Sequence, residues 1–119
     1  MAYVSQSDKK ELSPAIKTVL KKYKMKGSIG IRHHSTLVVN IKSGVIDFSE
    51  QLGDRESINV NEYWIEKNYQ GDALNFLSEL LKAMEGPDYF NEDDGMTDYF
   101  HRSHYTDINI GGNKGYEMV

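Results

Sequence analysis

Residues 28–41, SIGIRHHSTLVVNI, decide the fold of this chain. Apolar side chains alternate with small or polar ones along most of the stretch, at Ile29, Ile31, Leu37, Val39 and Ile41. This two-residue period is typical of strands with one buried face. The polar pair His34-Ser35 separates the two runs. Since strands joined by so short a turn run antiparallel, the stretch predicts a β-hairpin with strands at 28–33 and 36–41.

Amphipathic helices are predicted on both sides of the hairpin. Before it, apolar residues recur every three or four positions, at Leu12, Ile16, Val19, Leu20 and Tyr23. Ser13-Pro14 indicates the N-cap and first residue of this helix, residues 7–12 form a separate turn or short helix, and Gly27 ends it. After the hairpin, a wider stripe lies at Ala73, Leu74, Leu77, Leu80, Leu81 and Met84. Gly86-Pro87 ends that helix.

The rest of the chain adds short strands to the hairpin. A third strand is predicted at 45–48 after the turn Ser43-Gly44, a short one at 57–60, and a last one at 105–110. Residues 63–69 favour a short irregular helix. The predicted fold is α+β, a two-layer sandwich of an antiparallel three- to four-stranded sheet with two helices packed on one face.

Length and composition favour a single domain, 1–119, with a real core. Cysteine is absent, which excludes disulfides, thiolate zinc sites and a cysteine nucleophile, and fits a reducing compartment. No stretch approaches the roughly 20 apolar residues of a membrane span, and the first eight residues lack a signal-peptide pattern. We therefore expect a cytoplasmic protein, including the cytoplasm of a host, with no membrane partner.

Charge is divided unevenly along the chain, whose net charge is −4. Residues 1–46 carry nine Lys and Arg against two acidic residues, a net +7, whereas residues 47–119 carry five against sixteen, a net −11. Three interpretations are open: a face that binds a polyanion, a docking surface, or two complementary faces of one domain.

No catalytic motif is recognisable, and neither a metal nor a cofactor is expected. Four histidines are candidate metal ligands, namely His33, His34, His101 and His104. Their spacing fits no metal-binding pattern, and residues 92–95 lack the alternating ligands of a calcium loop. An enzyme with an unfamiliar site around His33, Asp47 and Tyr99 is the least favoured function.

Two charged surfaces are the candidate binding sites. The basic one is predicted to contact phosphates, with Lys17, Lys21, Lys22, Lys24 and Arg32 as its main residues and Lys9, Lys10 and Lys26 beside them. The order of elements is that of a double-stranded-RNA-binding domain, but the second helix opens with Gly71-Asp72 and is net acidic, which argues against that family.

The acidic surface interleaves carboxylates with aromatic rings and suits a basic protein partner. Its residues are Asp88, Tyr89, Glu92, Asp93, Asp94, Asp98 and Tyr99. The alternative is that these aromatic rings belong to the core and the acids are ordinary surface charge.

Several segments together resemble a known family. They are residues 15–23, 34–48, 60–64, 73–77, 97–100 and 107–111. In this combination the chain resembles one of the large polyvalent protein-associated domains, a family of phages and conjugative elements, although it departs from the pattern near 101–104 and 112–114. The resemblance implies a protein that helps mobile DNA to establish itself. We therefore expect an inhibitor of a host defence component, of the anti-CRISPR or anti-restriction type, acting through protein contacts. The alternative is a nucleic-acid-binding accessory protein; a monomer and a homodimer are both open.

Overall fold

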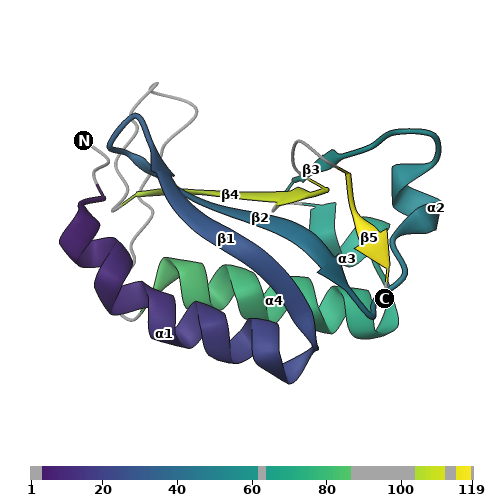
Figure 1. Ribbon diagram of the computed structural model, residues 1–119, viewed down its shortest axis with the longest axis horizontal. Helices are drawn as coiled ribbons and strands as arrows, with labels where there is room; N and C mark the ends of the chain where they lie inside the picture. Colours follow the sequence, from purple (N-terminus) through teal and green to yellow (C-terminus); the bar gives the residue numbers. More distant parts are fainter. Residues whose placement is uncertain (1–3, 62–63, 87–103, 112–114, 119) are drawn as a thin grey trace.

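The computed structural model describes residues 4–61, 64–86, 104–111 and 115–118. Its elements follow the chain as α1 (Gln6–Lys22), β1 (Met25–Arg32), β2 (Thr36–Gly44), α2 (Ser49–Leu52), β3 (Ile58–Val60), α3 (Ile65–Asn68), α4 (Gly71–Glu85), β4 (Tyr105–Ile110) and β5 (Glu117–Met118). Figure 1 shows a twisted sheet with α1 and α4 side by side against one face. The predicted two-layer α+β sandwich is therefore confirmed. None of the described helices combines the length and the apolar character that crossing a bilayer requires.

The sheet is mixed, whereas the sequence predicted an antiparallel one. Its strands lie in the order β1-β2-β4-β3, and β5 pairs with the end of β2. β1 and β3 are antiparallel to their neighbours, but β4 is parallel to β2. A parallel neighbour needs a long crossover, and α4 supplies it by returning the chain beneath the sheet to the end where β2 begins (Figure 1). The short-turn rule applies to the hairpin alone, so the expected orientation of the last strand was wrong.

The core lies between the sheet and the two long helices. β2 contributes three side chains with no exposed surface, Leu37, Val39 and Ile41. They belong to one cluster with residues of α1 and α4, among them Ile16, Leu20, Phe76, Leu77 and Leu80. Burying each such side chain contributes about 1.5–3 kcal/mol. The alternation that predicted the hairpin and the stripe that predicted α4 are thus the inner faces of the two layers.

Most of the predicted elements are present, with one exception. The strands at 57–60 and 105–110 correspond to β3 and β4. The strand predicted at 45–48 does not form. Ile46 and Phe48 are buried, but the backbone there pairs with no described strand and passes into α2.

Helix α1 begins eight residues before the predicted start. Ser5 is its N-cap: the hydroxyl accepts the N–H of Asp8 at 3.1 Å, and the Asp8 carboxylate accepts the N–H of Ser5 at 2.9 Å. This reciprocal capping box satisfies two donors at the helix end. Pro14 consequently lies inside the helix, where it removes one backbone bond. The Ser13 hydroxyl donates to the carbonyl of Lys9 at 2.6 Å in the same turn.

Candidate nucleic-acid interface

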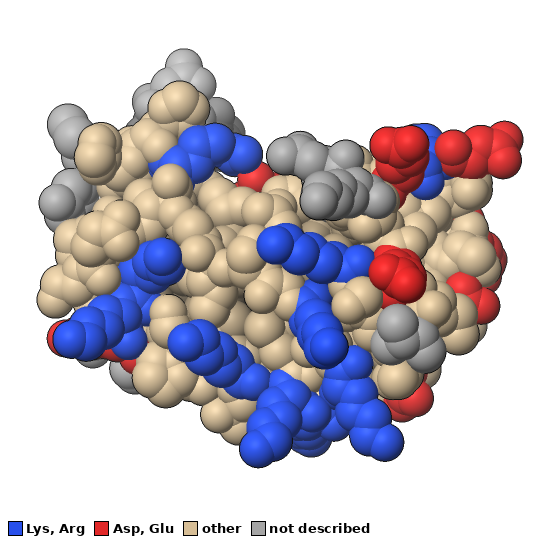
Figure 2. Space-filling model, in the orientation of Figure 1, with Lys and Arg blue, Asp and Glu red and all other residues tan. Residues whose placement is uncertain are grey.

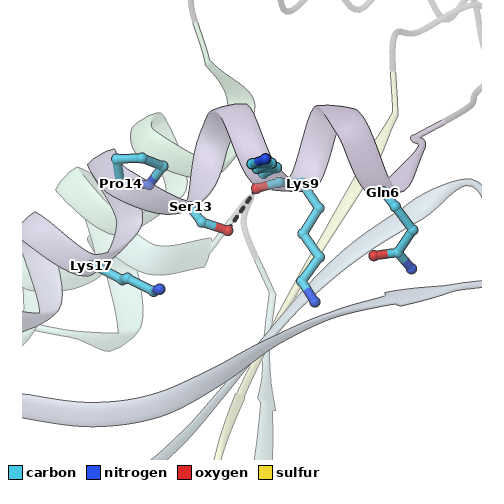
Figure 3. A pocket seen from close by; sticks show the side chains of 6 residues that line it. Gln6, Lys9, Ser13, Pro14 and Lys17 are labelled. Carbon is cyan, nitrogen blue, oxygen red and sulfur yellow. Dashed lines mark hydrogen bonds between the residues drawn. The ribbon is translucent and has the colours of Figure 1, made fainter.

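Six lysines line two adjoining hollows along one side of α1 and the start of β1. The first hollow, of about 600 Å³, is lined by Lys9, Lys10 and Lys17 among others. Figure 3 shows the side chains that line it. The second, of about 650 Å³, is lined by Lys17, Lys21, Lys24 and Lys26. Because Lys17 borders both, the two hollows adjoin each other, and we call the pair the trough. We call Lys9, Lys10, Lys17, Lys21, Lys24 and Lys26 the lysine surface.

The helical repeat places these side chains together. Lys10, Lys17 and Lys21 are seven and four residues apart and therefore share one side of α1. The buried residues Ile16 and Leu20 turn the neighbouring side of the helix toward the core. The lysine stripe thus follows directly from the amphipathic pattern of α1.

The connection between α1 and β1 supplies the remaining two lysines. Lys24 has a φ of +56°, which turns the chain sharply after the helix. Lys26 is the first exposed residue of β1. In the described sheet β1 pairs only with β2, so its other edge is open and carries backbone N–H groups. The trough therefore has ammonium groups on the helix side and a strand edge beside them.

The acidic half of the chain does not neutralise the lysine surface within the described residues. Ion pairs there join only Lys22 to Glu79 and Arg32 to Asp107, each at 2.8 Å. In Figure 2, Lys and Arg gather over the part of the face formed by α1 and β1, and Asp and Glu gather at the end formed by α2 and β5. On this face of the molecule, the two kinds of charge are therefore segregated.

Lys22 lies apart from the lysine surface and holds α1 to α4. Its ammonium donates to one carboxylate oxygen of Glu79, and the Tyr23 hydroxyl donates to the other. These two donors, Lys22 first, lower the pKa of the Glu79 carboxyl. The ring of Tyr23 also packs edge-on against Phe76, with centroids 5.4 Å apart. The predicted phosphate-binding residue Lys22 is thus engaged in joining two helices.

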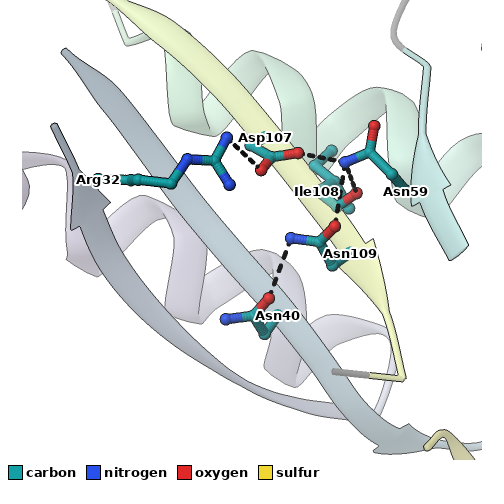
Figure 4. A network of polar contacts seen from close by, with 6 residues as sticks. All are labelled: Arg32, Asn40, Asn59, Asp107, Ile108 and Asn109. Carbon is teal, nitrogen blue, oxygen red and sulfur yellow. Dashed lines mark hydrogen bonds and ion pairs between the residues drawn. The ribbon is translucent and has the colours of Figure 1, made fainter. Parts of the chain in front are cut away.

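Arg32 lies on the open face of the sheet, opposite the helices. Its guanidinium pairs with Asp107, whose side chain is only 11% exposed. Beside this pair, three asparagines in cross-strand register link β2, β4 and β3 (Figure 4). Asn109 donates to Asn40 at 3.1 Å, and Asn59 donates to Asn109 at 3.0 Å. The charge of Arg32 is therefore used within a polar network, away from the lysine surface.

The acidic surface predicted from the sequence lies outside the described residues. This applies to all seven of its members, Asp88, Tyr89, Glu92, Asp93, Asp94, Asp98 and Tyr99. Among the described residues, the acidic end of the molecule carries one large exposed ring, that of Trp64, which is 48% exposed. The ammonium of Lys67 lies over this ring, 4.9 Å from its centroid.

Of the three residues of the least favoured hypothesis, an enzyme, Tyr99 lies outside the described residues, and His33 and Asp47 are far apart. His33 precedes β2 and Asp47 follows it, so the nine-residue strand separates them by about 30 Å. The hydroxyl of Ser49, followed by its backbone N–H, donates to the Asp47 carboxylate and lowers the pKa of Asp47. His104 is buried, with Nε2 2.9 Å from the carbonyl oxygen of Met84. In the described part of the chain, no three His, Asp or Glu residues are grouped to hold a metal ion.

Neither the lysine surface nor the fold could be compared with a relative. Comparison of the chain with protein families, with curated proteins and with solved structures found no match. The resemblance to a large polyvalent protein-associated domain accordingly stays a prediction.

Proposed function

We propose that this protein is a nucleic-acid-binding accessory protein that holds the phosphate backbone on its lysine surface. The observation that carries the proposal is a group of six lysines around one trough, none of them paired with a described carboxylate. Neutralising phosphates with such side chains releases condensed counterions, which is the main source of sequence-independent affinity.

The arrangement is unfavourable for the protein alone. Lys17 and Lys21 are four residues apart on α1, and like charges at this spacing destabilise a helix by about 0.2–0.5 kcal/mol. A phosphate backbone lying in the trough would remove this repulsion. Lys21 also complements the helix dipole in the last turn of α1, but binding of a polyanion would account for the like-charge pair itself.

Retention on heparin and on immobilised DNA tests the proposal. The variant Lys17→Gln/Lys21→Gln/Lys24→Gln removes three charges from the lysine surface and should elute at clearly lower salt. The matched control is Lys42→Gln/Lys67→Gln/Lys82→Gln, which removes three exposed charges elsewhere and should elute close to the wild type. Equal elution of both variants, or no retention of the wild type, would rule out this function.

A second proposal is that the protein inhibits a host defence component through its acidic side. Two observations favour it: the alternation of carboxylates and aromatic rings in residues 88–100, and the exposed ring of Trp64 at the acidic end. Carboxylates steer a basic partner and aromatic rings supply most of the contact energy. The partner expected from the resemblance is a nuclease or CRISPR effector of the host of a phage or plasmid. Co-purification of such a protein, lost when Asp93, Asp94 and Asp98 become Asn, would support it; unchanged co-purification would contradict it.

A further inference from the structure

We infer that the ligand of the lysine surface is double-stranded DNA, held by its backbone without reading its sequence. The inference rests on the proposed function and adds the class of nucleic acid. It follows from the chemistry of the trough lining, from the kind of basic side chain used and from the length of the lysine stripe.

The trough offers no stacking platform for unpaired bases. Proteins that hold single strands combine a basic groove with aromatic side chains on which the bases stack. None of the described residues that line the two hollows is aromatic; between the lysines they are Gln6, Ser13, Pro14, Leu20, Met25 and Gly27. A duplex keeps its bases stacked internally and presents only its backbone, so it needs no such platform.

The lining holds few groups that read base edges or ribose. All six cations are lysines, which act mainly as point charges, whereas the planar fork of arginine suits bidentate contacts. Duplex RNA is recognised largely through its 2′-hydroxyls, but the Ser13 hydroxyl already donates to the carbonyl of Lys9 within the helix. Gln6 is the remaining uncharged polar side chain among the described residues of the lining (Figure 3). Phosphate contacts to DNA are the interaction that this lining provides best.

The length of the stripe sets the footprint. From Lys9 to Lys21 the helix rises about 18 Å. At 3.4 Å per base pair this corresponds to about five base pairs. The open edge of β1 adds backbone N–H donors, which also contact phosphates in protein–DNA complexes. Up to six neutralised phosphates give a slope of about −5 for log K against log salt with duplex DNA.

Fluorescence anisotropy with defined probes tests the inference. The probes are a 16-base-pair DNA duplex, oligo-dT of 16 nucleotides, a 16-base-pair RNA duplex and polyglutamate, each titrated with the full chain at 50, 100 and 200 mM salt. The slopes for duplex and single-stranded DNA should differ by about 1.2, so lowering the salt from 200 to 50 mM should increase the preference for the duplex by about fivefold. Changing the duplex sequence should alter the affinity less than twofold, and shortening it below about five base pairs should weaken binding sharply.

The variants complete the test. Lys17→Gln/Lys21→Gln/Lys24→Gln should reduce the slope with duplex DNA by about 2.7, whereas Lys42→Gln/Lys67→Gln/Lys82→Gln should reduce it by less than one. Circular dichroism melts establish that both remain folded. Equal or tighter binding to oligo-dT or to the RNA duplex would overturn the choice of duplex DNA and leave the proposed function standing. Preference for polyglutamate would assign the surface to an acidic protein, and binding to no probe would overturn both proposals.

Discussion

The turn between β1 and β2 holds two histidines in a backbone conformation that favours other residues. φ is +55° at His33 and +58° at His34, and the N–H of Ser35 donates to the carbonyl of Arg32 at 3.3 Å. Two successive central residues with positive φ are the requirement of a type I′ turn, for which Asn-Gly is the preferred sequence. We therefore predict that His33→Asn/His34→Gly stabilises the protein.

The magnitude follows from the backbone angles. A left-handed conformation costs a residue other than glycine about 1–2 kcal/mol, and asparagine tolerates it better than most. Glycine offsets about 0.5–1 kcal/mol of this gain, because it loses more conformational freedom on folding than other residues do. The free energy of unfolding should therefore rise by about 1 kcal/mol, which corresponds to about 4 °C in Tm for a domain of this size. The carbonyl of His34, which accepts the N–H of Val4 at 2.8 Å, is retained because it belongs to the backbone.

Urea and thermal unfolding followed by circular dichroism measure this change. His33→Ala/His34→Ala is the matched control, since it removes both imidazole rings without favouring positive φ, and it should give no stabilisation. If Asn-Gly melts at or below the temperature of the wild type, the turn does not hold these angles in solution. Affinity for duplex DNA should stay unchanged in both variants, because the turn lies at the far end of β1 from Lys24 and Lys26.

Three further predictions concern single residues. The backbone N–H of Ser5, followed by its hydroxyl, lowers the pKa of Asp8. The stability that this contact contributes is complete above about pH 4 and is lost as the pH falls through the lowered pKa. Asp8→Asn should therefore destabilise the protein to urea at pH 7 and not at pH 2. Burial raises the pKa of Tyr116 to about 12, and burial also raises the pKa of Tyr69. Ultraviolet titration should therefore show a late tyrosine phase that loses one group in Tyr116→Phe, and the stability that neutral Tyr116 contributes below pH 10 should be lost between pH 10 and 12. At Gly27 an added Cβ would lie 2.5 Å from the carbonyl oxygen of Asn40, so Gly27→Ala should cost about 1–3 kcal/mol in a denaturant melt. A wild-type midpoint for this last variant would contradict the close approach of the two strands.

Local pattern predicted the elements of this fold better than their arrangement. The hairpin and α4 have an unbroken period of two and of three to four residues, and their inner faces proved to be the core. The parallel pairing of β4 with β2 could not be predicted from local pattern. The path of some sixty intervening residues decides it, and the pattern of the strand itself does not. The start of α1 was misplaced for a different reason. Pro14 is a strong local signal for a first helical turn, but the capping box at Ser5 and Asp8 lies further upstream and sets the helix start.

The candidate site was predicted in part from the same kind of pattern. Positions off the apolar stripe of α1 were expected to face solvent, and Lys17, Lys21 and Lys24 do line the trough. The roles of Lys22 and Arg32 were not visible in the sequence, since their partners Glu79 and Asp107 follow them by 57 and 75 residues. The trough itself was missed, because its second hollow forms only where the side of α1 meets the beginning of β1.

The way in which this chain compensates its charges argues that the lysine surface has a role outside folding. Where a cation supports the fold, a partner is provided: Lys22 has Glu79 across the helix pair, and Arg32 has Asp107 across the sheet. Along the trough, the like charges on one side of α1 have no such partner among the described residues. Sequences that specify a fold satisfy local rules except where function requires otherwise. Because these unpaired cations line the two hollows, a ligand that carries several negative charges at short spacing is the simplest physical reason for them.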